Sequence, residues 1–141
     1  MTWVGWALLS AAFAGATAVL AKVGVEGVNS HFATALRTTV ILMITWAIAL
    51  AFAPRASLVL PGRRTLVFLA LSAAATGLSW VCYFRALQLG EASRVAPIDK
   101  LSVVFAIVLA AVFLRERVTL QTLVGAALIV AGSLVIAWKA T

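Results

Sequence analysis

Five long apolar stretches, joined by short connections, account for most of this chain. A membrane-spanning helix needs about 20 mostly apolar residues to cross about 30 Å of hydrocarbon. The sequence therefore predicts five spans, at approximately residues 2–21, 33–53, 65–87, 95–114 and 118–138. Because five is an odd number, we expect the two termini on opposite sides of a bilayer. Too little chain remains outside the spans for a soluble domain.

The composition favours helices in a lipid bilayer over a soluble fold. Hydrophobic residues make up 65% of the chain and charged residues 11%, whereas a soluble domain carries about 25% charged residues. The spans are rich in Leu, Ala and Gly and lack the ten-residue alternation of a transmembrane barrel. We therefore predict an all-α polytopic membrane protein with five transmembrane helices and one domain, residues 1–141.

The basic residues do not form a surface for nucleic acid. The net charge is +7, but the eleven Lys and Arg residues are scattered among loops and span ends and form no cationic face. Loop charges that orient the spans explain them better. Five of these residues lie on the N-terminal side: Arg55, Arg63, Arg64, Arg115 and Arg117. Six lie on or near the other side: Lys22, Arg37, Arg85, Arg94, Lys100 and Lys139. This near balance leaves insertion in both orientations open.

The sequence contains no pattern typical of an enzyme active site. His31 is the only histidine and Cys82 the only cysteine, so they offer no cluster of metal ligands. No nucleophile motif accompanies them. We therefore predict no catalytic residue, no metal and no cofactor.

Ionisable residues inside the spans mark the candidate site, because they are costly in lipid and usually face a protein interior or an aqueous cavity. Asp99 and Lys100 lie in the fourth span and Arg37 in the second. At about 100° per residue, Arg37 shares a helix face with several threonines, and Asp99 shares one with Ser102. We predict that these four residues line a substrate or ion pathway. Two alternatives stay open: Asp99, shortly after Pro97, suits the first turn of a helix, and Lys100 and Arg37 can extend to the headgroups.

The third span adds a polar and aromatic face. Ser79, Trp80 and Tyr83 fall on one helical stripe, while Arg85 points the other way. We predict that the stripe walls the same pathway, with ordinary aromatic packing as the alternative. Arg85 lies near the end of the span, so we expect it to reach the headgroups.

Small residues in the fifth span indicate close helix packing. Gly125 and Gly132 are about two helical turns apart, and Ile129 lies on the same face. Such a face lets another helix approach closely. We predict a dimer contact there, with packing inside the chain as the alternative.

Several short segments give the chain a resemblance to a known family. From Ala86 the chain reads ALQLGEASRVAPIDKLSVVFAIVLAAVFLRERVTLQTLVGAALIVAGSLVIAW, and its opening contains WALLSAAFAGATAVLAKVG. The matching elements are Ala92, Ser93, Val95, Ala96 and Pro97 entering the fourth span, Leu114, Arg115, Glu116 and Arg117 before the fifth, and GAALIVAG at residues 125–132. With these elements the chain resembles the EamA-type domain of the drug/metabolite transporter superfamily.

The resemblance implies a half-transporter unit of five helices. Most members look like two such units in tandem and export or exchange small metabolites. An odd number of helices inverts the second unit in the membrane, and inverted repeats are a common transporter design. A single unit can reproduce this arrangement only by pairing with an oppositely oriented copy or with a homologous partner. Two departures stand out: no proline lies near Val103, and Asp99 and Lys100 occupy positions that are usually uncharged.

These observations favour a transporter in the plasma membrane, the inner membrane of a bacterium. We predict that it exports or exchanges a small polar metabolite by alternating access, as a homodimer of single or dual topology or with a homologous membrane partner. Arg37 and Lys100 outweigh Asp99 by one positive charge, which favours a substrate with a carboxylate or phosphate. The alternative is a non-transporting membrane subunit that scaffolds or stabilises a partner complex.

Overall fold

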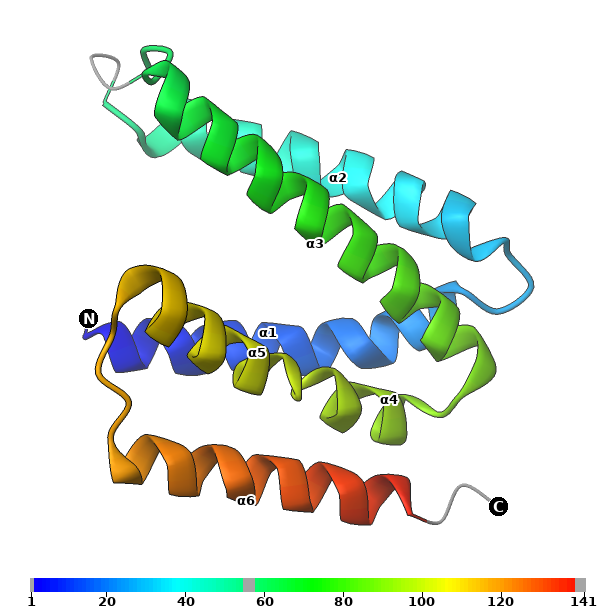
Figure 1. The fold of residues 1–141 in the computed structure, drawn as a ribbon. Helices are drawn as coiled ribbons and strands as arrows, with labels where there is room; N and C mark the ends of the chain where they lie inside the picture. The colour runs from blue at the N-terminus through cyan, green and yellow to red at the C-terminus, as the bar shows by residue number, and fades with distance from the viewer. Residues whose placement is uncertain (1, 55–57, 139–141) are drawn as a thin grey trace. The chain divides into compact units, whose positions relative to one another are not determined.

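The computed structural model describes residues 2–54 and 58–138, and within these ranges the regular structure is helical, without strands (Figure 1). The elements are α1 (Trp3–Gly24), α2 (Ser30–Phe52), α3 (Arg63–Leu89), α4 (Ala92–Asp99), α5 (Ser102–Leu109), the π-helical turn η2 (Ala110–Leu114) and α6 (Leu120–Ala137). Five stretches of the described chain are long and apolar enough to cross a membrane: α1, α2, α3, the stretch from α4 to η2, and α6. The predicted all-α fold with five spans is confirmed. Arg55 and Lys139, which entered the charge balance, lie outside the described residues.

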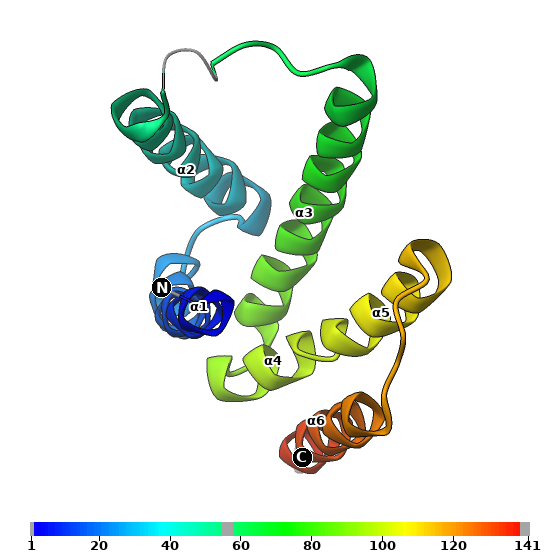
Figure 2. The same ribbon diagram turned by 90° about the vertical axis from the view of Figure 1, so that its left-hand side faces the viewer.

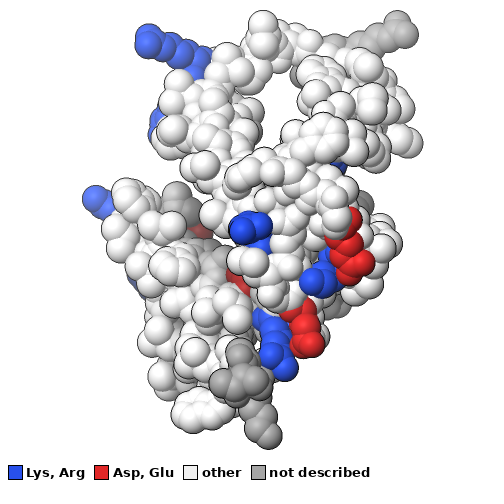
Figure 3. All heavy atoms as spheres, turned by 90° about the vertical axis from the view of Figure 1, so that its right-hand side faces the viewer, with Lys and Arg blue, Asp and Glu red and all other residues white. Residues whose placement is uncertain are grey.

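Most side chains of the spans are exposed, as lipid-facing helices require. Large apolar residues such as Trp3, Phe13 and Phe105 are exposed, and uncharged residues cover most of the face drawn in Figure 3. Helices satisfy their backbone hydrogen bonds internally, which hydrocarbon demands because it offers no water as a partner. An exposed apolar surface of this kind is suited to contact with lipid.

The chain divides into two compact units according to its internal contacts. The first, called the broken-helix unit, comprises residues 1–20 and 90–141, with most of α1, then α4, α5, η2 and α6. The second, called the groove unit, comprises residues 21–89, with the end of α1, then α2 and α3. The single domain predicted for residues 1–141 stays a prediction.

In the groove unit, α2 begins where the sequence provides a helix cap. The Asn29 side-chain oxygen accepts hydrogen bonds from the backbone N–H groups of His31 (3.0 Å) and Phe32 (3.4 Å), which a helix start would otherwise leave unpaired. Gly27 precedes it with a φ of 72°, a left-handed conformation that glycine adopts without strain. The helix therefore starts at Ser30 and not at the predicted residue 33.

A small buried cluster closes the end of the groove unit where α1 ends, α2 begins and α3 ends. Leu87 and Val25 are almost completely buried, at 0% and 1% exposure. Among the described residues few hydrophobic groups are hidden this well, so the cluster is the main packed core of this part of the chain. Its buried residues are Ala21, Val25, Ser30, Thr34, Phe84 and Leu87.

Two polar side chains tie the same end together through backbone carbonyls. Lys22 Nζ donates to the Leu87 carbonyl at 2.7 Å, and a cation near the C-terminus of a helix such as α3 is favourable. Gln88 Nε2 donates to the carbonyls of Val25 (3.3 Å) and Val28 (2.6 Å) in the α1–α2 connection. These bonds fix the end of α3 to that connection. From there α2 and α3 diverge toward the connection between them (Figure 2).

In the broken-helix unit, the predicted fourth span is present from Ala92 to Leu114, but it contains a break that the sequence analysis did not predict. α4 ends at Asp99 and α5 begins at Ser102. Because α4 begins at Ala92 and not at residue 95, Asp99 lies in its last turn. The interpretation of Asp99 as a residue of the first helical turn is therefore wrong.

The break follows Pro97, which lies inside α4. Proline has no N–H and its ring crowds the preceding turn. After it, the N–H groups of Lys100 and Leu101 donate to carbonyls three residues back, those of Pro97 (3.1 Å) and Ile98 (3.0 Å). Such bonds are typical of 3₁₀ turns, which often mark a hinge in a helix.

Candidate functional site

Arg37 forms the centre of a cation–aromatic cluster in the groove unit. Its guanidinium carbon lies 4.5 Å from the centroid of the Trp80 ring and 5.4 Å from that of Phe84. Trp80 and Phe84 are four residues apart on α3 and therefore share a helix face. Stacking on aromatic rings stabilises a cation while leaving the N–H edge of a guanidinium available for hydrogen bonds.

The groove unit provides no acidic side chain to neutralise Arg37. Glu26 is the only Asp or Glu among residues 21–89, and it lies in the connection before α2. The ion pairs within the described ranges join Arg94 to Glu91 and Lys100 to Asp99. Charged residues in a span usually pair with an opposite charge. Within its own unit, Arg37 therefore lacks a counter-ion.

A groove of about 390 Å³ lies between α2 and α3. Trp80 lines the groove and also contacts Arg37, so the cation–aromatic cluster lies at one end of it. Its wall is mostly apolar with several hydroxyl groups, and its volume falls within the usual range for small-molecule sites, about 300–1,000 Å³. The hydroxyl-bearing residues of the wall are Thr38, Thr45, Ser72 and Thr76.

The threonine hydroxyls of the groove already donate their protons elsewhere. Thr38 Oγ1 donates to the Thr34 carbonyl at 2.8 Å, and Thr76 Oγ1 donates to the Ser72 carbonyl at 2.9 Å. Thr45 likewise bonds back to its own helix. A hydroxyl has one proton and two lone pairs, so these groups can offer a ligand only acceptors.

The other two residues predicted on α3 differ in exposure. Tyr83 is half-buried, and Ser79 is exposed and is not part of the groove wall. The structure thus brings Arg37 and Trp80 together; the roles of all four residues in a pathway stay predictions.

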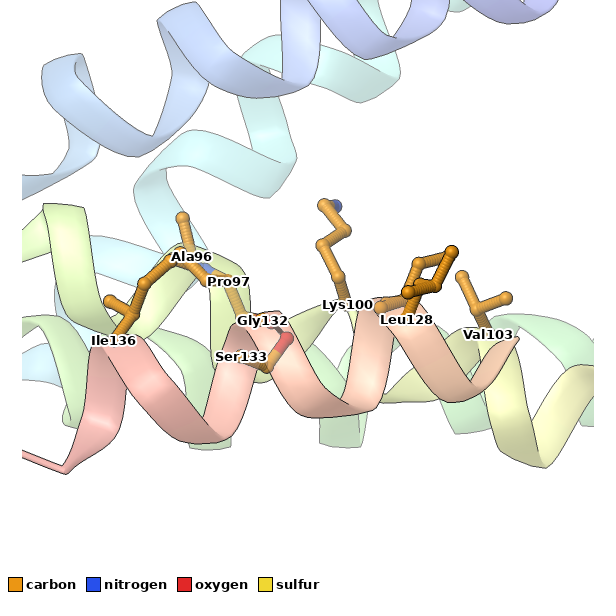
Figure 4. Close-up of a pocket in the computed structure, with 9 residues that line it drawn as sticks. Ala96, Pro97, Lys100, Val103, Leu128, Gly132, Ser133 and Ile136 are labelled. Carbon is orange, nitrogen blue, oxygen red and sulfur yellow. Dashed lines mark hydrogen bonds between the residues drawn. The ribbon is translucent and has the colours of Figure 1, made fainter. Parts of the chain in front are cut away.

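The broken-helix unit contains a second hollow, a cavity of about 530 Å³ between α4–α5 and α6 (Figure 4). Its wall is mostly apolar, with Ser133 and Lys100 as exceptions. Ser133 is 5% exposed and its Oγ donates to the Pro97 carbonyl at 2.9 Å. The same carbonyl accepts the Lys100 N–H. Ser133 therefore joins α6 to the backbone immediately before the break.

The charged residues at the break form a local pair. Lys100 Nζ lies 3.6 Å from Asp99 Oδ2, with the two side chains 55% and 38% exposed. In Figure 4 the Lys100 side chain extends away from α6. Ser102 begins α5, is exposed and lies outside the cavity wall. The part of these residues in a pathway stays a prediction, as does the predicted proximity of Arg37, which belongs to the other unit.

The small-residue face of α6 has both covered and open parts. Ile129 and Gly132 line the cavity beside α4 and α5, which agrees with packing inside the chain. However, a Cβ added at Gly125 or Gly132 would meet nothing within 4 Å. Contacts within the described chain therefore do not require glycine at either position, and the dimer contact stays a prediction.

Phe84 and Ser133 are among the residues of these sites that were not predicted. Phe84 completes the cation–aromatic cluster, and its position one turn after Trp80 was a usable signal. Ser133 stands out as a hydroxyl beside Gly132 in an apolar span. Its partner is a backbone carbonyl, however, and no side-chain pattern identifies that partner.

Comparisons with known proteins agree with the membrane-spanning fold. A family model described as the EamA-like transporter family matches residues 1–138. A Sinorhizobium protein described as an uncharacterized transporter in the cobO 3' region is 53% identical over 137 residues, which cover 96% of this chain and 96% of the relative. No solved structure is significantly similar to the chain.

Proposed function

Because the chain belongs to the EamA-like transporter family, we propose that it moves a small polar metabolite across the membrane by alternating access. Family membership and five membrane-length helices make it a multi-pass membrane transporter. We further propose that the protein exports or exchanges its substrate in a bacterial inner membrane.

The observation that carries the proposal is the position of Arg37. It lies inside a span, stacked on Trp80 and Phe84, at the end of a groove with hydroxyl groups in its wall. Arginine in hydrocarbon is costly and is retained mainly where it faces a pathway or a partner charge. An aromatic and hydroxyl-lined groove beside such a cation is suited to a polar solute.

The broken fourth span supports a mechanism with a conformational change. Discontinuous helices recur in transporters, where the break lies near the substrate or coupling ion. Here the break carries Asp99, Lys100 and Ser102, and the Ser133 bond to Pro97 holds it. We propose that these three residues line the pathway and that the break acts as a hinge.

Alternating access around a central site needs a second, inverted five-helix unit. We propose that a second copy or a homologous partner supplies it. The face of Gly125 and Gly132 on α6 is the proposed contact, since added Cβ atoms there meet open space. Reporters fused to the C-terminus test the dual-topology form: a signal from one side of the membrane alone contradicts it.

Transport is tested by reconstituting the purified chain into liposomes. The liposomes are loaded with radiolabelled small carboxylates, phosphate esters, amino acids and polyols, and release is compared with protein-free liposomes. We expect faster release of at least one compound than from protein-free liposomes. In Arg37→Gln, release of that compound should be at least about tenfold slower than in the wild type, because one charge-assisted interaction is lost. Arg85→Gln is the matched control, because Arg85 is exposed and bonds to Gln88 outside the groove. Folded protein that releases none of the compounds contradicts transport and favours the scaffold role.

A further inference from the structure

We infer that the α2–α3 groove binds an organic anion that carries hydrogen-bond donors beside its charged group. The carboxylate or phosphate would lie at Arg37, and hydroxyl or ammonium groups would face the threonine oxygens. This inference rests on the proposed transport function and names the class of substrate. Hydroxy acids and polyol phosphates have this chemistry.

The charged end of the ligand follows from the guanidinium. Arg37 has no counter-ion within its unit, and its guanidinium carbon lies over the Trp80 and Phe84 rings, 4.5 and 5.4 Å from their centroids. A guanidinium placed over aromatic rings keeps its N–H edge available for hydrogen bonds. That edge matches the two oxygens of a carboxylate or phosphate in a bidentate contact.

The donor groups of the ligand follow from the hydroxyls. Thr38 and Thr76 donate their protons to carbonyls of their own helices, so they present lone pairs to the groove. Threonine oxygens that offer only lone pairs do not favour the oxygens of an anion. They do favour O–H or N–H groups, which should therefore lie next to the anionic group and not replace it.

The position along the helix favours a dissolved solute over a lipid headgroup, although phospholipids carry the same chemistry. Arg37 lies seven residues after the start of α2 at Ser30, about 10 Å along the axis at 1.5 Å per residue. A headgroup would have to reach that depth. The groove continues past Thr38 toward Thr45, about another 10 Å, which is enough for a small metabolite.

Binding is measured on the purified full chain in detergent with two probes, sn-glycerol 3-phosphate and D-glycerate. Each has one anionic group and two hydroxyls. Glycerol, which lacks the anion, and inorganic phosphate, which lacks carbon-bound hydroxyls, are the comparison compounds. A thermal-shift titration gives apparent affinities, because ligands of the native state raise its stability. We expect at least one probe to bind at least about tenfold more tightly than either comparison compound.

Variants separate the two parts of the site. Arg37→Gln should weaken probe binding at least about tenfold, and Arg37→Lys, which keeps the charge but not the planar fork, should fall between it and the wild type. Thr38→Val should weaken the probes but not inorganic phosphate. Arg85→Gln should bind like the wild type. If Arg37→Gln does not fold, the comparison of Arg37→Lys with Arg85→Gln decides.

Three outcomes overturn the inference: neither probe binds, binding survives in Arg37→Gln or is unchanged in Arg37→Lys, or dioleoylphosphatidylglycerol added to the micelles displaces the probe. The last outcome would assign the groove to lipid headgroups. The flux assay tests transport independently of the anion site. Release of a compound that does not depend on Arg37 refutes the anion site alone, whereas Arg37-dependent binding without any release refutes transport alone.

Discussion

The α2–α3 pair and the α4–α6 pair use their polar groups in opposite ways. Between α2 and α3, hydroxyls bond within their own helices, and the cation Arg37 rests on aromatic rings without an acidic partner in its unit. Between α4 and α6, the buried hydroxyl of Ser133 bonds across to the Pro97 carbonyl, and Lys100 is paired with Asp99. The polar groups that remain available to a ligand, the Arg37 guanidinium and the threonine oxygens, are thus concentrated in the groove unit.

The two pairs also differ in how they are held together. The groove unit is closed at one end by a buried cluster and by bonds from Lys22 and Gln88 to carbonyls. The α4–α6 pair has one buried residue in contact across it, Ser133, beside an open apolar cavity. A firmly closed end suits a binding site that must keep its shape. A loosely held break suits a part that must move.

The largest effect on stability is expected at the closed end of the groove unit. Leu87→Ala removes a side chain with 0% exposure and should lower the free energy of unfolding by about 2 to 3 kcal/mol, because a cavity remains. SDS titration in mixed micelles measures it. Leu128→Ala on α6 is the control: Leu128 is 68% exposed and should lose less than about 0.5 kcal/mol. Equal losses would remove the contrast in packing.

A smaller loss is expected when the carbonyl contacts of Gln88 are removed. Gln88→Met keeps the side-chain length but deletes the bonds to Val25 and Val28, at a cost of about 1 to 2 kcal/mol. Without these bonds the α1–α2 connection is held less firmly, so its amide N–H groups should exchange faster with solvent. Gln121→Met, at an exposed position of α6, should be neutral. An unchanged exchange rate in Gln88→Met would show that packing alone closes this end.

The sequence was sufficient to predict the spans and much of the polar stripe on α2. Span length follows from bilayer thickness, and helical phase placed Arg37 with its neighbouring threonines. Phase also placed Trp80 and Tyr83 on one face of α3. It could not pair the two helices, so the contact of Arg37 with Trp80 required the structure.

The break in the fourth span was missed because of where hydropathy sets a helix end. Starting the span at residue 95 places Pro97 in the first turn, where proline is tolerated. The structure starts α4 at Ala92, after Glu91, whose carboxylate pairs with Arg94 at 3.1 Å. Polar residues thus extend the helix outward beyond the apolar segment. Pro97 then lies in the helix interior, where it disrupts the hydrogen-bond ladder.

Removing the Ser133 hydroxyl tests how firmly the break is held. Ser133→Ala should lower the free energy of unfolding by about 0.5 to 1 kcal/mol, since hydrogen bonds between membrane helices are modest. If the break is a hinge, flux should change more than stability does. Ser10→Ala, at an exposed position of α1, is the control. A stability loss with unchanged flux would make Ser133 a purely structural residue.

The smallest effect on stability is expected at the Asp99–Lys100 pair, whose side chains are 38% and 55% exposed. Pairs this exposed contribute little to folding, so Asp99→Asn and Lys100→Met should each stay within about 0.5 kcal/mol of the wild type. Each should nevertheless slow flux, because it leaves one unpaired charge at the break. The double variant has neither charge of the pair. Its flux relative to the wild type should therefore exceed the product of the relative fluxes of the two single variants. If the two losses of flux are independent, each residue contacts the substrate separately. The α4–α6 pair would then use its charged groups in the same way as the α2–α3 pair uses Arg37.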